Sequence, residues 1–229
     1  MYYHGTTKGN ADDIVKTQLM IPSVGDEQWL GDGCYFYVDA EYAFRWILIK
    51  YTNNFRNEFS ADYSNIYGEY TIVSAEINID DERLFSMENI QNRLLFIKVK
   101  TEISQKMAQS DKYRGSMKNN SVVDGVVFNY LFKYEGYDKK YDAVKAVFPI
   151  SYIYDDSRMD FLPEPQICVK NSKILSDFKI FSSESVPKEY AAFIKEYNDI
   201  KYALKKREKD LNRYKAKPKN IKYRKKELT

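Results

Sequence analysis

The sequence predicts an α+β fold, because short strand patterns mix irregularly with helical ones and show no regular βαβ repeat. With 229 residues, of which 44% are hydrophobic and 16% aromatic, the chain can bury a substantial core. We find no internal repeat. We therefore expect one compact domain over 1–185, followed by a basic helical extension over 186–229.

The N-terminal quarter of the chain predicts two strands, each followed by a helix. Tyr2–Thr7 has the pattern of a short strand that breaks at Gly5 into a loop. Asn10 is expected to cap the first helix. A short aromatic strand over 34–37 then leads to Asp39, the expected cap of the second helix.

The alternation over 70–79 predicts the clearest strand. Ile72 faces one side of it, and the other side carries Val73, Ala75, Ile77 and Ile79. The remaining expected elements are helices over 87–107 and 122–132, strands over 141–148, 166–169 and 174–181, and a basic helix from Pro187 to about Tyr214.

Several classes of protein are disfavoured by composition. No apolar run approaches the ~20 residues of a membrane span, and no signal-peptide pattern is present, so we expect a cytoplasmic protein without a membrane partner. One histidine and two cysteines favour neither a disulfide framework nor a metal site. Nothing around Cys34 resembles a cysteine-hydrolase motif, so a Cys34–His4 nucleophile pair is disfavoured.

Charge is distributed unevenly along the chain. Residues 201–229 carry a net charge of +10, whereas residues 1–200 carry −7. This asymmetry predicts an anionic partner for the tail, with a solvated helix as the alternative. Tyr202, Tyr214 and Tyr223 lie among these cations, and we expect them to pack the helix onto the body rather than to stack on single-stranded bases.

Two short motifs carry the chemistry. His4-Gly5-Thr6 ends the first strand, and Gly31-Asp32-Gly33-Cys34-Tyr35-Phe36 precedes a helix rich in alanine and aromatic residues. Together they resemble the ADP-ribosyltransferase superfamily, most nearly its His-Tyr-Glu branch, which includes the poly-ADP-ribose polymerases. The later segments 141–148 and 166–171 are similar to strands of bacterial transferases from toxin–antitoxin and anti-phage loci.

This resemblance implies a split β-sheet with flanking helices, and NAD as co-substrate. His4 would hydrogen-bond a ribose hydroxyl, and Tyr35 would stack on the cationic nicotinamide ring. Gly5 would offer its backbone to the carboxamide, and Thr6 would support the adenosine side. Gly33 would also belong to the cofactor-binding set.

The third catalytic element departs from the family pattern. The resemblance implies a catalytic glutamate at the start of a late strand, where this sequence has Gln166, with Glu164 two residues earlier. Glu164 shares a strand face with Gln166 if the strand extends that far, but Pro165 can pull the segment out of the sheet. Either Glu164 is the catalytic carboxylate, assisted by Gln166, or the site lacks one there. Asp142 is a lesser candidate, with a turn or cap as its favoured role.

The function implied is mono-ADP-ribosylation by a toxin or anti-phage effector, with a nucleic-acid acceptor favoured over a protein and with an antitoxin as a further partner. Within the same fold, the alternatives are an RNA 2′-phosphotransferase, which needs additional arginines, and an NAD glycohydrolase. Arg45 and Arg158 have no assigned role. A catalytically inactive nucleic-acid- or protein-binding module is the alternative from another class.

Overall fold

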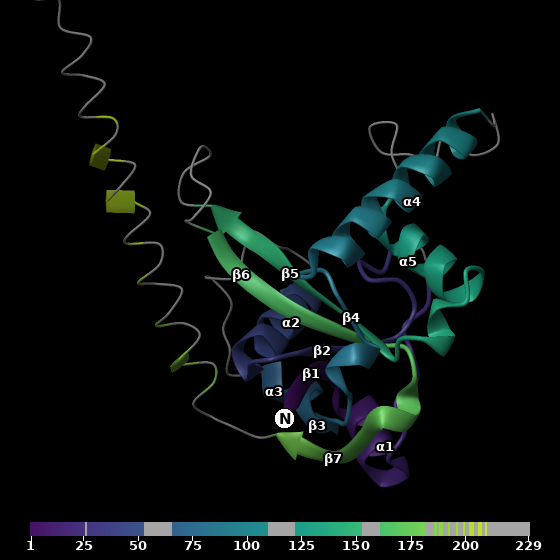
Figure 1. Cartoon of the computed structure of the whole chain (residues 1–229). Helices are drawn as coiled ribbons and strands as arrows, with labels where there is room; N and C mark the ends of the chain where they lie inside the picture. The colour runs from purple at the N-terminus through teal and green to yellow at the C-terminus, as the bar shows by residue number, and fades with distance from the viewer. Residues whose placement is uncertain are drawn as a thin grey trace, which may run out of the picture.

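The computed structural model describes residues 1–25, 27–52, 66–109, 122–152 and 161–181, with scattered positions between 186 and 209. It is an α+β structure, which confirms the predicted class (Figure 1). The helices are α1 (Lys8–Thr17), α2 (Ala40–Thr52), α3 (Ile66–Glu69), α4 (Ile90–Ala108) and α5 (Asp124–Lys133). The strands are β1 (Tyr2–Thr7), β2 (Cys34–Tyr37), β3 (Tyr70–Ile77), β4 (Leu84–Ser86), β5 (Ala143–Tyr152), β6 (Phe161–Val169) and β7 (Leu175–Phe181).

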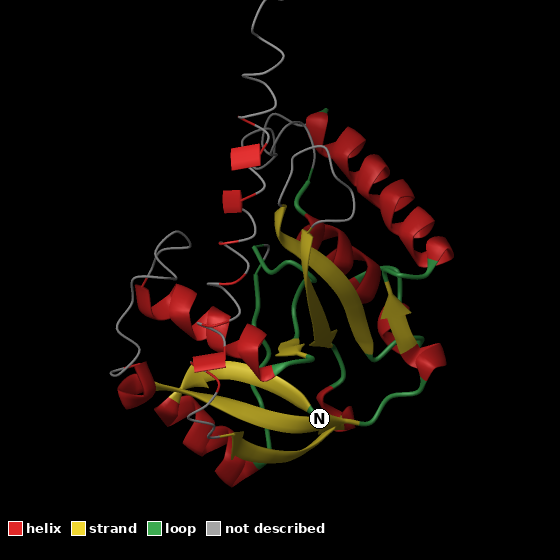
Figure 2. Ribbon diagram, turned by 90° about the vertical axis from the view of Figure 1, so that its left-hand side faces the viewer, coloured by secondary structure: helices red, strands yellow, loops and turns green. Residues whose placement is uncertain are grey.

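The seven strands form one sheet in the order β4-β5-β6-β2-β1-β3-β7, antiparallel except for the β4–β5 pair. Its two halves are joined weakly. β1 pairs with β3 along all of Tyr2–Thr7, but its register with β2 is the single pair Tyr3–Tyr37. Figure 2 shows the strands diverging into two groups. The gap between β1 and β2 therefore opens near the middle of the sheet.

Helices cover both faces of the sheet. α1 packs on one face against Val73, Ala75 and Ile77, and Ile72 packs on the other face with residues of α2. The predicted division of the 70–79 strand into two faces is thus confirmed for these residues. α4 and α5 pack against β4, β5 and β6 through a separate core cluster. Because strand pairing aligns Gln166 with Ala146 and Tyr37, this cluster and the α2 cluster share one face of the sheet.

The first strand corrects two predictions. β1 does not break at Gly5, because Gly5 pairs with Ile72 and the strand continues to Thr7. A Cβ atom at Gly5 would lie 2.5 Å from the Ala43 carbonyl oxygen, so glycine lets α2 approach β1 closely. The N-cap of α1 is Thr7 rather than Asn10, and the Thr7 side chain accepts a hydrogen bond from the Asn10 backbone N–H.

Strand β6 begins earlier than predicted. Pro163 and Pro165 lie inside it and pair with β5, so the proline-rich segment belongs to the sheet. The pairing of β6 with β2 ends at Gln166, so the part of β6 before Gln166 has no β2 partner on that side and forms an edge. A proline, which lacks an N–H, is tolerated on such an edge. Glu164 is consequently held in strand geometry, on the same face as Gln166.

Several shorter elements were not predicted, namely α3, β4 and the 3₁₀ turns at 81–83, 137–139 and 172–174. The sequence also predicts an irregular loop over 51–66 and a break over 115–121. Residues 53–65 and 115–121 lie outside the described ranges, whereas 51–52 belong to α2 and 66 to α3, so the predicted ends of the loop are wrong. No helix among the described residues combines the length and the apolar character that a membrane crossing requires.

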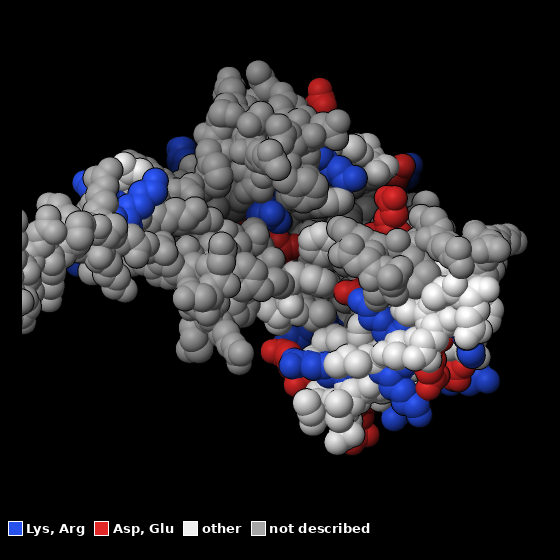
Figure 3. All heavy atoms as spheres, turned by 90° about the horizontal axis from the view of Figure 1, so that it is seen from above, with Lys and Arg blue, Asp and Glu red and all other residues white. Residues whose placement is uncertain are grey.

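The C-terminal extension is described only in part. The described positions between 186 and 209 are helical, and Val186 is buried in the α2 cluster. Tyr202 is 72% exposed, so its predicted packing onto the body is wrong. Residues 210–229, with Tyr214 and Tyr223, lie outside the described ranges. On the face in Figure 3, basic and acidic side chains are intermingled over the described surface.

Candidate functional site

The gap between β1 and β2 holds a cavity of about 370 Å³. Its lining includes His4, Tyr35, Tyr37, Arg45, Glu164 and Gln166. In a continuous sheet, His4 would face away from Tyr35 and Tyr37, because Tyr3 pairs with Tyr37 and side chains alternate along a strand. The divergence of β1 from β2 lets side chains of both faces line one cavity.

His4 is half-buried, and its Nδ1 lies 2.8 Å from the Tyr35 carbonyl oxygen. A carbonyl oxygen can only accept, so Nδ1 carries the proton. Burial lowers the pKa of His4 to about 4, against the opposing effect of this hydrogen bond, so the ring is neutral at pH 7. The other nitrogen, Nε2, is therefore an acceptor, suited to a hydroxyl group that donates.

Tyr35 is fixed at its hydroxyl end. That hydroxyl donates to the Gly31 carbonyl at 2.6 Å and accepts from the Leu30 N–H at 2.8 Å. Burial, with a smaller contribution from Cys168, raises the pKa of Tyr35 well above its usual range, so the phenol stays protonated. With its hydroxyl engaged by the loop before β2, Tyr35 offers the cavity an aromatic ring rather than an acid or base.

Glu164 and Gln166 lie side by side on β6, each buried. Arg45 on α2 contacts Glu164 through Nη1 and Oε2, 2.7 Å apart, with side-chain exposures of 11% and 3%. The Gln166 amide donates a short hydrogen bond to the other oxygen, Oε1. The structure thus brings both late-strand candidates to the cavity and pairs the carboxylate with a cation.

The Glu164 carboxylate also affects the pKa of Tyr37. Burial and, secondly, the negative charge of Glu164 raise the pKa of Tyr37 far above its usual range, against the effect of Arg45. Arg45 itself was left unassigned from the sequence, since its partner lies 119 residues away. The available signal was a single charged residue within the otherwise apolar run 43–49, because a buried cation implies a buried acid. Arg158 lies outside the described residues.

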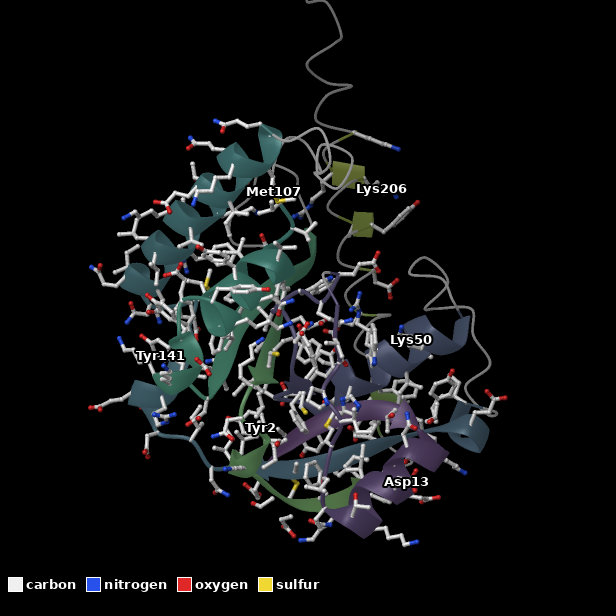
Figure 4. All side chains as sticks on the ribbon, turned by 90° about the vertical axis from the view of Figure 1, so that its right-hand side faces the viewer. Tyr2, Asp13, Lys50, Met107, Tyr141 and Lys206 are labelled. Atoms are coloured by element: carbon white, nitrogen blue, oxygen red, sulfur yellow. The ribbon has the colours of Figure 1, made fainter. Side chains whose placement is uncertain are left out.

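A second cavity of about 860 Å³ adjoins the first. The two share His4, Ser23, Trp46 and Lys50 in their linings, and the larger one extends to Thr6 and Asp13. Figure 4 shows Lys50 on α2 and Asp13 on α1, with β1 running between these helices. Lys50 Nζ lies 4.5 Å from the centroid of the Trp46 ring, so a cation and an aromatic ring stand at the junction.

Gly5 and Gly33, the two glycines predicted to bind the cofactor, have packing roles in this structure. A Cβ atom on Gly33 would lie 2.5 Å from Cys168 Sγ and 2.6 Å from the Val169 carbonyl, so glycine lets β2 lie against β6. Gly5 meets α2 in the same way, although it also lines the larger cavity. Their predicted contacts with a cofactor remain predictions.

Asp142 and Cys34 lie outside the linings of both cavities. Asp142 pairs with Arg83 and accepts from the Asn171 amide at 2.8 Å, in keeping with its favoured structural role. Cys34 is fully buried, and burial raises the pKa of its thiol to about 12, so a thiolate is disfavoured at neutral pH.

Comparison with known proteins finds an archaeal relative. The chain is 32% identical over 214 residues to a protein of Methanocaldococcus jannaschii described as "Uncharacterized protein MJ0359", with 86% of this chain and 94% of the relative aligned. The chain therefore belongs to the family of that archaeal protein. No protein-family model and no solved structure matches the chain.

Proposed function

We propose that this chain, with the family to which it belongs, is an NAD-consuming ADP-ribosyltransferase whose reaction takes place in the β1–β2 cavity. One observation carries the proposal. His4, Tyr35, Glu164 and Gln166 come from three distant segments, and they line one cavity. The two N-terminal motifs imply His4 and Tyr35, and the register of the late strand makes Glu164 and Gln166 the candidates for the third catalytic element. Neither step uses knowledge of the fold, so the convergence of these residues supports the proposal.

The reaction breaks the bond between ribose C1′ and the nicotinamide nitrogen, and the electron pair leaves with nicotinamide. Positive charge then develops on the ribose, as in glycoside hydrolysis, until an acceptor oxygen or nitrogen bonds C1′ and releases its proton. A carboxylate stabilises that charge, whereas an amide cannot supply it. We therefore assign this role to Glu164, with Gln166 orienting it through the hydrogen bond to Oε1.

The neutral parts of the cavity suit the other groups of the substrate. Nε2 of His4 accepts from a ribose hydroxyl, since Nδ1 is committed to the Tyr35 carbonyl. The ring of Tyr35 provides an aromatic surface for the cationic nicotinamide. Because its hydroxyl is held by residues 30 and 31, the ring is positioned before substrate arrives, which lowers the entropic cost of binding.

The two cavities fit a dinucleotide in size and in charge. Small-molecule sites usually measure about 300–1,000 Å³, and both cavities fall in this range. We place the nicotinamide riboside in the smaller cavity and adenosine in the larger, near Thr6. The pyrophosphate then passes Lys50 at the shared wall, where a cation favours its negative charge.

The acceptor class we favour is nucleic acid. The net charge of +10 over 201–229 suits a phosphate backbone. Each phosphate contact releases counterions, so binding to an RNA or DNA acceptor should weaken steeply as salt increases. A protein acceptor would show a weaker dependence.

The test is incubation of the purified protein with labelled NAD and whole-cell lysate. We expect a labelled macromolecule that nuclease destroys and protease does not, and no labelling by the His4→Ala variant. Release of nicotinamide without labelling would make the protein an NAD glycohydrolase instead. Binding of NAD without turnover would make the protein a binding module. If NAD does not bind, it is not the substrate, and the proposal is wrong.

A further inference from the structure

Two residues that line the cavity, Arg45 and Glu164, form an ion pair. Arg45 reaches Glu164 from α2, with 2.7 Å between Nη1 and Oε2. The carboxylate has a side-chain exposure of 3%, so water does little to stabilise its charge. Gln166 donates to Oε1, so each oxygen of Glu164 has a protein donor.

Burial and ion pairing act on this carboxyl group in opposite directions. Removal from water favours the neutral acid, whereas a cation at hydrogen-bond distance favours the carboxylate. A guanidinium is effectively always charged in proteins, so Arg45 supplies its positive charge at every accessible pH. The amide of Gln166 can donate but brings no net charge. Of Arg45 and Gln166, the two partners described here, only Arg45 supplies a positive charge that favours the carboxylate.

We propose that Arg45 is a positioning residue that keeps the buried Glu164 carboxylate ionised and directed into the cavity. Its catalytic significance rests on the function proposed above, because a neutral carboxylic acid cannot stabilise a cationic ribose. Arg45 need not touch substrate for this role; it acts through Glu164. The effect on ionisation itself can be measured whether or not NAD is the substrate.

Several other charged or titratable groups among the described residues lie near Glu164 or line the same cavity. His4 is neutral at pH 7, and the phenol of Tyr37 is protonated. Tyr42 has its pKa raised, chiefly by burial, with Asp39 and then Glu164 as further causes. Among the described residues that line this cavity, Glu27 and Lys50 are also charged. Lys50 is an exposed residue whose ammonium lies over Trp46, which makes it the matched control for loss of a cation from α2.

The first measurement is an NMR titration of the Glu164 carboxyl carbon in protein labelled with ¹³C-glutamate. The signal is assigned by its loss in Glu164→Gln. Arg45→Met should raise the titration midpoint by roughly 1 to 3 pH units, whereas Arg45→Lys and Lys50→Met should leave it close to wild type. Should Arg45→Met fail to fold, Arg45→Gln provides a second neutral variant.

An unchanged midpoint in a folded neutral variant overturns the proposal. So does a Glu164 signal that already titrates above neutral pH in the wild-type protein, because Arg45 would then not keep it charged.

The second measurement is the pH profile of NAD turnover in the wild-type protein and the Arg45 variants. In Arg45→Met, kcat should fall at acidic and neutral pH and recover as pH rises, with little change in KM. A raised KM without a shifted acidic limb would mean that Arg45 binds substrate directly, which contradicts the proposal. If no variant and no wild-type sample consumes NAD while the NMR midpoint shifts, the ionisation role stands and the transferase function fails.

Discussion

Two arginine–carboxylate pairs hold this fold together at different places, and their surroundings differ. Asp142 accepts two hydrogen bonds from Arg83 and one from Asn171, and its own backbone bonds to residues 83, 170 and 171. Glu164 has Arg45 and Gln166 as partners, yet it lines a cavity of about 370 Å³. Asp142 lines none of the cavities described above.

The comparison shows that residue type alone does not separate a structural carboxylate from a catalytic one. Both carboxylates are buried, with residue exposures of 4% for Asp142 and 2% for Glu164. What differs is whether open space lies beside the charge. Asp142 joins the start of β5 to the turn before β4 and the end of β6, whereas Glu164 faces space that a substrate can fill.

Replacement of Glu164 should have the largest effect. Glu164→Gln removes the charge and keeps the shape, so turnover of NAD should fall by about 10²–10³-fold, with a much smaller change in apparent affinity. Steady-state kinetics with labelled NAD measure both. Gln166→Ala is the matched control and should cost less, because an amide orients but supplies no charge. If both variants turn over like wild type, the late-strand assignment is wrong.

The next largest effect concerns Tyr35, whose ring and hydroxyl have separate roles. Tyr35→Ala removes the stacking surface and should cost about 2–3 kcal/mol of transition-state stabilisation. Tyr35→Phe keeps the ring but loses the contacts with Leu30 and Gly31, so it should mainly lower stability, by about 1–2 kcal/mol. Denaturant unfolding and NAD kinetics separate these effects. Equal loss of turnover in both would show that the hydroxyl, not the ring, is needed.

Asp142→Asn should lower stability and leave turnover unchanged, whereas Glu164→Gln should lower turnover. The Arg83 hydrogen bonds, followed by the contact with Asn171, lower the pKa of Asp142 despite its burial. The Arg83 side chain is 41% exposed, so solvent screens the pair and the loss of stability should be about 1–2 kcal/mol. Turnover at a temperature where the variant is folded should match wild type. A large loss of turnover at full stability would return Asp142 to the catalytic candidates.

The last effect is the pH dependence of folding stability that His4 produces. Its pKa is lowered from 6.5 to about 4 in the folded protein, so between these values the unfolded chain binds the proton more readily. The contribution of His4 to stability is therefore present above pH 6.5 and is lost as pH falls towards 4, by about 1–3 kcal/mol. Denaturant unfolding at pH 7 and 4.5 measures it against His4→Gln. If the two proteins lose the same stability, His4 is not the source.

The sequence predicted the fold class and the convergence of His4, Tyr35, Glu164 and Gln166 better than it predicted their local geometry. The two faces of β3 could be predicted from the local sequence, because alternating apolar residues lie on opposite faces of a strand. The end of β1 was misjudged because a glycine that breaks a strand and a glycine that admits a neighbouring helix look alike in sequence. Arg45 was missed because its partnership with Glu164 depends on tertiary contact between α2 and β6.

The most direct test of the central claim is a crystal structure of Glu164→Gln with NAD bound, since that variant should bind the substrate and consume it far more slowly than wild type. The account predicts the nicotinamide ring against Tyr35 and a ribose hydroxyl donating to Nε2 of His4. It also predicts the pyrophosphate beside Lys50. NAD bound at any other surface would contradict the account, as would an empty β1–β2 cavity at saturating NAD.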